Sequence, residues 1–259
     1  MNLELGGKVV VITGGTDGLG LALATRLAEE GASVAVCGRD EERLGAAART
    51  VGEAGGGQVL AQRADVSRPP DLEGLVDVVM ARWGRMDGVV HNAGRSSAGS
   101  IEAVDDAAWE SDLQLKLMAA VRLTRLAMPQ LRATKGSILF TLAMAAKAPG
   151  GASEPSSVSR AAGMALMKAL SKELAPAGVR ANAILIGLIE SGQWVRAAAG
   201  SGTDVAEFYE RAAKNSGIPL GRFGRADEFA DLASYLLSSR ASYVTGAAIN
   251  LDGGLSPVV

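Results

Sequence analysis

The amino-acid sequence predicts one α/β domain built on a doubly wound parallel sheet, and two observations support this fold class. Short runs rich in β-branched residues alternate with longer helical patterns, and the runs themselves are almost continuously apolar. Such strands are typical of a parallel sheet that is covered by helices on both faces, with right-handed crossovers between strands. No linker rich in proline, glycine or serine interrupts the alternation, so we expect residues 1–259 to form a single domain.

Each expected strand is a short apolar run that is followed by a segment of helical length. The expected strands are 8–13, 33–37, 58–63, 86–91, 136–141, 179–185 and 246–251. The expected helices are 18–30, 40–54, 69–83, 105–132, 155–175, 203–215 and 226–239. This alternation predicts about seven strands in the sheet.

Residues 190–220 depart from the short connections found elsewhere in the chain. A long excursion beside the carboxyl edge of a parallel sheet often forms a lid over a substrate site. We therefore expect a substrate-side lid here, and a helical insertion on the surface is the alternative.

The composition favours a well-packed cytoplasmic domain and gives no sign of a nucleic-acid or membrane partner. Apolar residues make up 48% of the chain and aromatic residues only 4%, so Ala, Val, Leu and Ile must fill the core. The formal net charge is −2, without a long block of like charge. The single Cys37 excludes a disulfide within the chain. The first apolar run is too short for a signal peptide, and no run approaches the roughly 18 residues that span a bilayer.

A glycine-rich turn directly follows the first expected strand and opens the first expected helix. In TGGTDGLG (13–20), Gly14, Gly18 and Gly20 let the backbone turn tightly and approach a pyrophosphate. The phosphate oxygens would lie at the helix N-terminus near Leu19, where backbone N–H groups lack partners. The strand–turn–helix context therefore predicts a dinucleotide-binding site, which also includes Thr16 and Asp17.

The end of the second expected strand bears on which dinucleotide binds. An enzyme that prefers NAD usually carries an acidic residue here, which holds the ribose 2′-hydroxyl. Gly38 instead leaves space, and Arg39 offers guanidinium donors for a 2′-phosphate, which favours NADP. Asp17 argues against NADP, because a basic residue in the turn would have helped to bind the phosphate. Arg39 also has an alternative role as the ion-pair partner of a neighbour such as Glu42, so NAD stays open as the second choice.

Five motifs occur in the order seen in the short-chain dehydrogenases/reductases, and the chain resembles that family over its whole length. They are TGGTDGLG (13–20), ADV (64–66), HNAG (91–94), IGLIES (186–191) and LDGG (251–254). The resemblance implies a Rossmann-like fold and an NAD(P)(H)-dependent oxidoreductase that acts on a small carbonyl, hydroxyl or enone compound. It also implies that the cofactor is bordered by Asp65, Val66, Asn92, Ala93, Gly94, Gly187, Leu188 and Ile189. Family members usually carry proline where this chain has Ile186.

The family's four catalytic residues are Asn, Ser, Tyr and Lys, and the resemblance places other residues at all four positions. Lys116 stands at the Asn position and Ala143 at the Ser position, while Ser156 and Arg160 stand at the Tyr and Lys positions. In similar enzymes the Tyr phenol, with an ordinary pKa near 10, donates the proton because the Lys charge stabilises its phenolate. Ser156 is shorter and a much weaker acid. Arg160 keeps the charge and could hold the cofactor ribose, but it releases no proton under ordinary conditions.

The resemblance places Lys116 close to Arg160 inside the pocket. A partly desolvated ammonium beside another cation has a lowered pKa, so Lys116 either donates the proton or binds a substrate carboxylate together with Arg160. The alternative is that its long stem carries the ammonium to solvent. Glu154 is either a minor catalytic candidate or an N-terminal cap or dipole partner of the helix that Pro155 begins. His91, the only histidine, is expected to be structural, and one His with one Cys gives no metal cluster.

Three functions stay open at this point. The first is a divergent NADP(H)-dependent oxidoreductase whose proton travels through water, Lys116 or the substrate itself. The second is a non-catalytic NADP-binding sensor or partner subunit, and the third is a cofactor-independent lyase or isomerase that uses the cationic pocket. We expect the enzyme, because Trp194 and the 190–220 excursion are kept at the substrate end. The helix at 155–175 is apolar on more than one face, and the resemblance implies a homodimer or homotetramer, with a monomer as the alternative.

Overall fold

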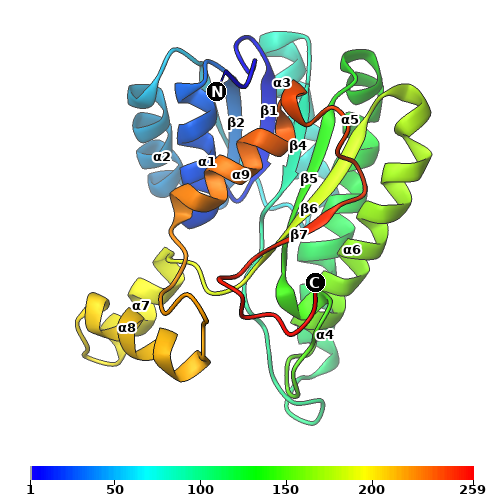
Figure 1. The fold of residues 1–259 in the computed structure, drawn as a ribbon. Coiled ribbons are helices and arrows are strands. Elements are labelled where there is room, and N and C mark those ends of the chain that lie inside the picture. Colours follow the sequence, from blue (N-terminus) through cyan, green and yellow to red (C-terminus); the bar gives the residue numbers. More distant parts are fainter. Residues whose placement is uncertain (1) are drawn as a thin grey trace.

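The computed structural model describes residues 2–259, which fold around a single parallel sheet (Figure 1). Within these residues the sheet has seven strands in the order β3-β2-β1-β4-β5-β6-β7, and every neighbouring pair is parallel. The strands are β1 (Val9–Thr13), β2 (Ser33–Gly38), β3 (Val59–Arg63), β4 (Gly88–His91), β5 (Ser137–Ala143), β6 (Arg180–Ile186) and β7 (Ala248–Leu251). The strand order reverses between β1 and β4, which confirms the doubly wound fold.

Helices cover both faces of the sheet (Figure 1). One face carries α1 (Gly18–Glu29), α2 (Glu41–Ala54) and α9 (Ala226–Leu237), and the other carries α3 (Pro69–Trp83), α5 (Ala119–Thr134) and α6 (Ser156–Glu173). The two buried clusters between sheet and helices consist mainly of Ala, Val, Leu and Ile, as the low aromatic content predicts. Of the helices in residues 2–259, none has the length and apolar character that a membrane span requires.

The helix expected at 105–132 is not regular throughout. Helix α4 (Asp106–Leu113) continues through a π-helical segment, Gln114–Met118, into α5. A π turn accommodates one extra residue, and such turns are frequent at functional sites. Lys116 lies in this segment. The chain is helical over the expected range, but apolar periodicity does not report this local change of hydrogen-bonding pattern.

Residues 190–220 hold two helices, α7 (Gly192–Gly200) and α8 (Val205–Ser216), of which only the second was expected. They lie together, apart from the helices that cover the sheet (Figure 1). They pack on the following residue Phe223, whose ring lies 5.5 Å from that of Trp194 and 5.0 Å from that of Tyr209. The short α7 carries few large apolar residues, which is why the sequence pattern does not reveal it.

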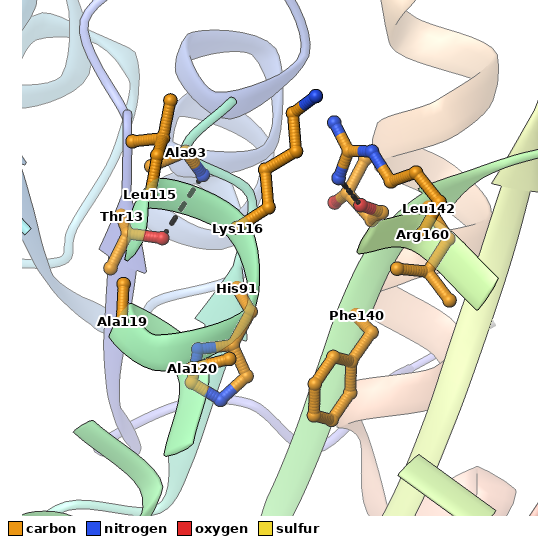
Figure 2. Close-up of a pocket in the computed structure, with 11 residues that line it drawn as sticks. Thr13, His91, Ala93, Leu115, Lys116, Ala119, Ala120, Phe140, Leu142 and Arg160 are labelled. Carbon is orange, nitrogen blue, oxygen red and sulfur yellow. Dashed lines mark hydrogen bonds between the residues drawn. The ribbon is translucent and has the colours of Figure 1, made fainter. Parts of the chain in front are cut away.

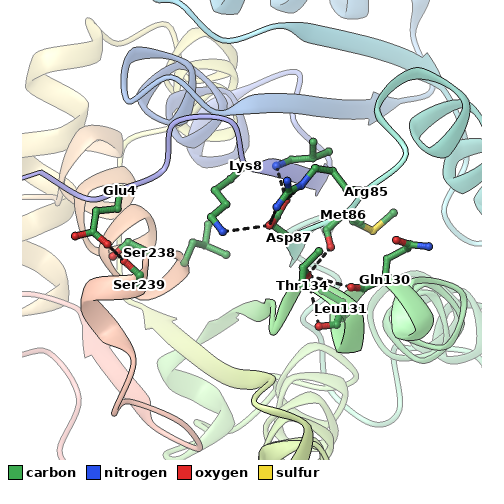
Figure 3. Close-up of polar contacts among 12 residues, drawn as sticks. Glu4, Lys8, Arg85, Met86, Asp87, Gln130, Leu131, Thr134, Ser238 and Ser239 are labelled. Atoms are coloured by element: carbon green, nitrogen blue, oxygen red, sulfur yellow. Dashed lines mark hydrogen bonds and ion pairs between the residues drawn. The ribbon is translucent and has the colours of Figure 1, made fainter.

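Asp87 ties the amino ends of β1 and β4 together (Figure 3). Its buried carboxylate accepts hydrogen bonds from Val9 N at 3.0 Å and from the Arg85 guanidinium at 2.7 and 2.8 Å, and Lys8 Nζ lies 3.4 Å away. Burial works to raise the pKa of Asp87, but the hydrogen bonds from Arg85 and Val9 and the charges of Arg85 and Lys8 lower it below its ordinary value.

We expect Asp87→Asn to destabilise the fold by about 1–3 kcal/mol at pH 7, because it removes the charge that these donors share. Since the folded pKa lies below the unfolded value near 4, this stabilisation is present above that value and is lost as the pH falls through the folded pKa. Urea unfolding at pH 7 and pH 3 should show a difference between wild type and variant that shrinks at the lower pH. The control is Asp231→Asn, which breaks an exposed pair with Arg26 and should cost less than about 1 kcal/mol. Equal losses in both variants would contradict the role of Asp87.

Candidate active site

The glycine-rich turn between β1 and α1 has the close backbone packing that a pyrophosphate site needs. Gly14 and Gly18 have left-handed φ angles of 68° and 51°. A Cβ on Gly20 would lie 2.3 Å from the Gly14 carbonyl oxygen and 2.6 Å from Asn92 Nδ2. Helix α1 therefore starts directly against β1, and its first N–H groups, around Leu19, lack carbonyl partners within the helix. This cradle fits a dinucleotide pyrophosphate.

Asp17 caps α1 and has two arginine partners that the sequence motifs do not single out. Asp17 Oδ1 accepts a hydrogen bond from Gly18 N at 2.7 Å. Its Oδ2 lies 2.6 Å from Arg43 Nη2 and 3.3 Å from Arg196 Nη1. The negative charge that argued against NADP is therefore balanced by two cations, one on α2 and one on α7.

Arg39, the residue expected to bind the 2′-phosphate, follows β2 and is exposed. A Cβ on Gly38 would lie 2.8 Å from Thr16 Cγ2, so the space that Gly38 leaves is taken up by the Thr16 methyl group. Across residues 2–259 the Arg39 side chain makes no ion pair, and the alternative pair with Glu42 is therefore not formed.

The loops after β3 and β4 lie at the same edge of the sheet as the turn. Asp65 Oδ1 accepts hydrogen bonds from Ser67 N and Oγ. Partial burial works to raise the pKa of Asp65, but these bonds and the charges of Arg39 and Arg68 lower it below its ordinary value. The adjoining Val66 is buried.

Asn92, Ala93 and Gly94 connect β4 to the turn and to the cationic side chains. The N–H groups of Asn92 and Ala93 both donate to Thr13 Oγ1, and Asn92 Nδ2 donates to the carbonyls of Thr13 and Gly14. A Cβ on Gly94 would lie 2.6 Å from Arg160 Nη2. The guanidinium of Arg160 therefore reaches the loop after β4.

Lys116 and Arg160 line one cavity at the carboxyl ends of β4 and β5, where their charged ends approach each other (Figure 2). The Lys116 side chain is only 1% exposed, so the alternative in which its ammonium extends to solvent was wrong. Burial lowers the pKa of Lys116, the hydrogen bond that Lys116 donates to Asp112 opposes this, and the charge of Arg160 adds to the lowering. Burial also lowers the pKa of Arg160, whose Nη1 donates to the Thr141 carbonyl at 2.6 Å.

A chain of polar side chains runs from the protein interior through Lys116, which lines this cavity, to Ser156. Ser159 Oγ donates to Asp112 Oδ2 at 2.6 Å, and Asp112 Oδ1 lies 2.5 Å from Lys116 Nζ. Lys116 Nζ in turn donates to Ser156 Oγ at 2.8 Å. The structure thus brings Lys116, Ser156 and Arg160 together, as the resemblance implied.

Two members of this chain, Asp112 and Ser159, were not among the expected site residues. The spacing of Asp112 and Lys116 carries a usable signal, because residues four apart lie on the same face of a helix. Ser159 has no comparable signal, since it meets Asp112 only through the packing of α6 on α4.

The structure also shows the surroundings of three further candidate residues, Ala143, Glu154 and His91. Ala143 ends β5 and offers no hydroxyl. Glu154 does not cap α6, since the helix begins at Ser156 after Pro155 without a side-chain cap bond, so that expectation was wrong. The backbone of Glu154 instead pairs with Gly99. His91 is buried with Nε2 2.9 Å from Thr124 Oγ1, and burial lowers its pKa to about 3, so it is neutral at physiological pH.

The segment after β6 passes over the glycine-rich turn. Gly187 is packed so closely that a Cβ would lie 2.7 Å from Asp252 Cα, and Ile189 is buried. A Cβ on Gly18 would lie 3.1 Å from Ser191 Cβ, and one on Gly192 would lie 2.3 Å from Asp17 Oδ2. The start of the 190–220 segment therefore touches the expected phosphate site directly.

Known proteins share this architecture over their full length. A family profile described as enoyl-(acyl carrier protein) reductase matches residues 14–256. L-sorbose reductase from Gluconobacter frateurii, solved with NADPH and L-sorbose, is 34% identical with a TM-score of 0.95 and 100% coverage of both chains. The 3-oxoacyl-[acyl-carrier-protein] reductase of Chlamydia muridarum is 29% identical over 99% of this chain and 100% of its own.

A second solved structure has a similar overall fold and is described as having an unusual catalytic site. The short-chain oxidoreductase from Pseudomonas aeruginosa PAO1, described as containing an atypical catalytic center, is 35% identical with a TM-score of 0.92. The match covers 97% of this chain and 98% of that one, and its structures include an apo and an NADPH-bound form. The extent of these matches and the seven-stranded fold together place the chain in the short-chain dehydrogenase/reductase family, as an oxidoreductase of that type.

Proposed function

We propose that the protein is an NADP(H)-dependent reductase of a small carbonyl or activated enone compound, or a dehydrogenase of the matching alcohol. The observation that carries this proposal is the hydrogen bond from the buried Lys116 ammonium to Ser156, beside the cavity that Arg160 also lines. An amine and a hydroxyl thus lie in hydrogen-bond contact, with the hydroxyl of Ser156 at the position where the resemblance places the family's phenol. The reduced nicotinamide supplies the hydride when the cofactor is bound.

The residues for binding the cofactor follow the strand ends. The pyrophosphate would lie on Gly14, Thr16, Asp17, Gly18, Leu19 and Gly20, with Arg39 at the 2′-phosphate. Asp65 and Val66 would border the adenine, and Asn92, Ala93, Gly94, Arg160, Gly187 and Ile189 the rest of the cofactor. Two relatives with 34–35% identity bind NADPH, which supports NADP over NAD.

Residues 190–220 would act as the substrate-side lid. The cluster around Trp194 packs the segment against Phe223 and Leu188, and the Arg196–Asp17 pair connects it to the glycine-rich turn. We also propose that the chain assembles as a homodimer or homotetramer through α6, on which the apolar Val158 is 44% exposed. Light scattering on the purified protein would test the assembly.

The function is tested with the full chain in two steps. Titration of NADPH and NADH by fluorescence should give binding of both or of NADPH alone, with NADPH the tighter ligand. A turnover screen with ketones, ketoses, enones and secondary alcohols should then reveal oxidation of NADPH, or reduction of NADP, with at least one class. Cofactor binding without any turnover would favour a non-catalytic NADP-binding protein, and absence of binding would overturn the proposal.

Arg39→Ser tests the choice of cofactor. We expect the affinity for NADPH to fall about 10- to 100-fold, because a charge-assisted contact with the 2′-phosphate is worth roughly 1.5–3 kcal/mol. The affinity for NADH should change by less than about threefold, and so should both affinities in the control Arg49→Ser, which removes an exposed cation from α2. An equal loss for NADPH and NADH in Arg39→Ser would place Arg39 away from the 2′-phosphate.

A further inference from the structure

The buried chain Ser159–Asp112–Lys116–Ser156 contains a carboxylate, Asp112, to which the resemblance assigns no role. We propose that Asp112 is a positioning residue that holds the Lys116 ammonium on Ser156, so that the hydroxyl hydrogen of Ser156 is the one that passes to the substrate oxygen. The inference rests on the proposed function and names the proton path within that same site.

The hydrogen bonds at Ser156 leave its own hydrogen free. A serine hydroxyl has two acceptor positions and one hydrogen to donate. Ser97 N donates to Ser156 Oγ at 2.9 Å, and Lys116 Nζ donates to it at 2.8 Å, so both acceptor positions are taken. In the part of the chain that the structure describes, the Ser156 hydroxyl has no acceptor for its hydrogen. That hydrogen is therefore available to a substrate oxygen.

The exposed fractions of Asp112, Lys116 and Ser156 indicate which end of this hydrogen-bonded series a substrate can reach. Asp112 and Lys116 have side chains that are 0% and 1% exposed, whereas Ser156 is only half-buried. The ammonium is thus walled off from bulk water, and the Ser156 hydroxyl is the end of the chain that a bound molecule can reach. Ser159, also buried, fixes the second oxygen of the Asp112 carboxylate at 2.6 Å.

Within residues 2–259, Asp112 supplies the negative charge that is in contact with Lys116. The charged groups that act on Lys116 are Asp112 from α4, Arg160 from α6 and Arg95 from the loop after β4, while His91 in the same cavity is neutral. Two of the three charges are positive and oppose a protonated amine, and burial opposes it as well. Without Asp112 the ammonium would lose its proton more readily and its fixed direction toward Ser156.

The proton transfers balance within these residues. As hydride reaches the carbonyl carbon, the Ser156 O–H bond breaks and the proton forms the O–H bond of the product alcohol. An N–H bond of Lys116 breaks at the same time, and its proton restores the Ser156 hydroxyl. Lys116 is left as a neutral amine beside Asp112, and after the product leaves it regains a proton from water through the half-buried Ser156 hydroxyl.

The test measures the protonation of Lys116 directly, in protein without cofactor or substrate. The Cε resonance of Lys116 in [13C]lysine-labelled full-length protein is assigned by its loss in Lys116→Met and is followed against pH. In Asp112→Asn we expect the midpoint at least about one pH unit lower than in wild type. The control Glu110→Gln removes an exposed carboxylate from the same helix and should leave the midpoint unchanged. An unchanged midpoint in Asp112→Asn would overturn the role of Asp112.

Kinetics then test the direction of the proton. Reduction needs protonated Lys116, so the rate falls as the pH rises through its pKa, and Asp112→Asn should move this fall to lower pH by the same interval as the midpoint. Ser156→Ala should lower turnover at least about 100-fold while the Lys116 midpoint stays within about half a pH unit of wild type. Turnover within threefold of wild type in Ser156→Ala would show that Lys116 donates directly, and would overturn the assignment to Ser156.

Two further outcomes separate a failure of this proposal from a failure of the variant to fold and from a failure of the proposed function. If Asp112→Asn does not fold, Ser159→Ala removes only the bond to the second carboxylate oxygen, and a smaller shift of the midpoint in the same direction is expected; no shift would overturn the proposal. If wild-type protein binds no NADPH, the proposed function fails, whereas the Lys116 titration still decides whether Asp112 holds the ammonium.

Discussion

Lys116→Met should lower the turnover of the enzyme at least about 100-fold, while its affinity for NADPH changes less than about threefold. The expected loss lies in the range for removing a general acid, which is roughly 10²–10⁴-fold. Methionine keeps the length and the apolar stem of the side chain but cannot donate to Ser156, so the chain from Asp112 is cut at its centre. Steady-state rates with the substrate found in the turnover screen, together with NADPH fluorescence titrations, measure both quantities.

Lys116→Met leaves the buried Asp112 carboxylate without its partner, so its control must account for a loss of stability. Removing one partner of a buried ion pair costs about 3–5 kcal/mol, because the other charge is left uncompensated. The double variant Asp112→Asn/Lys116→Met removes both charges and should recover stability without recovering turnover. Lys172→Met, at an exposed position on α6, should leave both unchanged. Turnover in Lys116→Met within threefold of wild type, at an equal folded fraction, would remove Lys116 from the reaction.

The fold could be predicted closely from the sequence because its signals are local and repeated. Each strand is an apolar run between turn residues, and the observed strands begin and end within about two residues of the expected ranges. The helices that cover the sheet were predicted for the same reason. The exceptions are short or irregular elements: α7, and the π segment around Lys116, depend on packing against neighbours that no local pattern reveals.

The candidate site was predictable only where a motif fixes its geometry. The glycine-rich turn could be located from three glycines between a strand and a helix. The surroundings of Lys116 could not, because whether a lysine points to solvent or into the interior depends on residues from distant parts of the chain. Asp112 and Ser159 are 47 residues apart and meet only in the folded protein. Arg196 likewise reaches Asp17 across 179 residues of sequence.

Gly20→Ala is expected to abolish measurable NADPH binding, with a loss of at least about 100-fold, and to destabilise the fold by about 1–3 kcal/mol. The added methyl group would lie 2.3 Å from the Gly14 carbonyl oxygen and 2.6 Å from Asn92 Nδ2. The first of these is backbone, which cannot rotate away, so α1 must move off β1. That movement displaces the N–H groups of the first turn from the positions where they would meet the pyrophosphate. Fluorescence titration and urea unfolding measure the two effects separately.

The matched control for Gly20→Ala is Gly74→Ala in the middle of α3, where a Cβ would meet nothing within 4 Å. Alanine is the better helix former by about 0.5–1 kcal/mol, so this variant should be slightly more stable than wild type and bind NADPH as tightly. The pair therefore compares the same chemical change at a crowded and at an open position. If Gly20→Ala binds NADPH within threefold of wild type, the cofactor does not depend on the close contact of α1 with β1, and the glycine-rich turn serves only the packing of helix on strand.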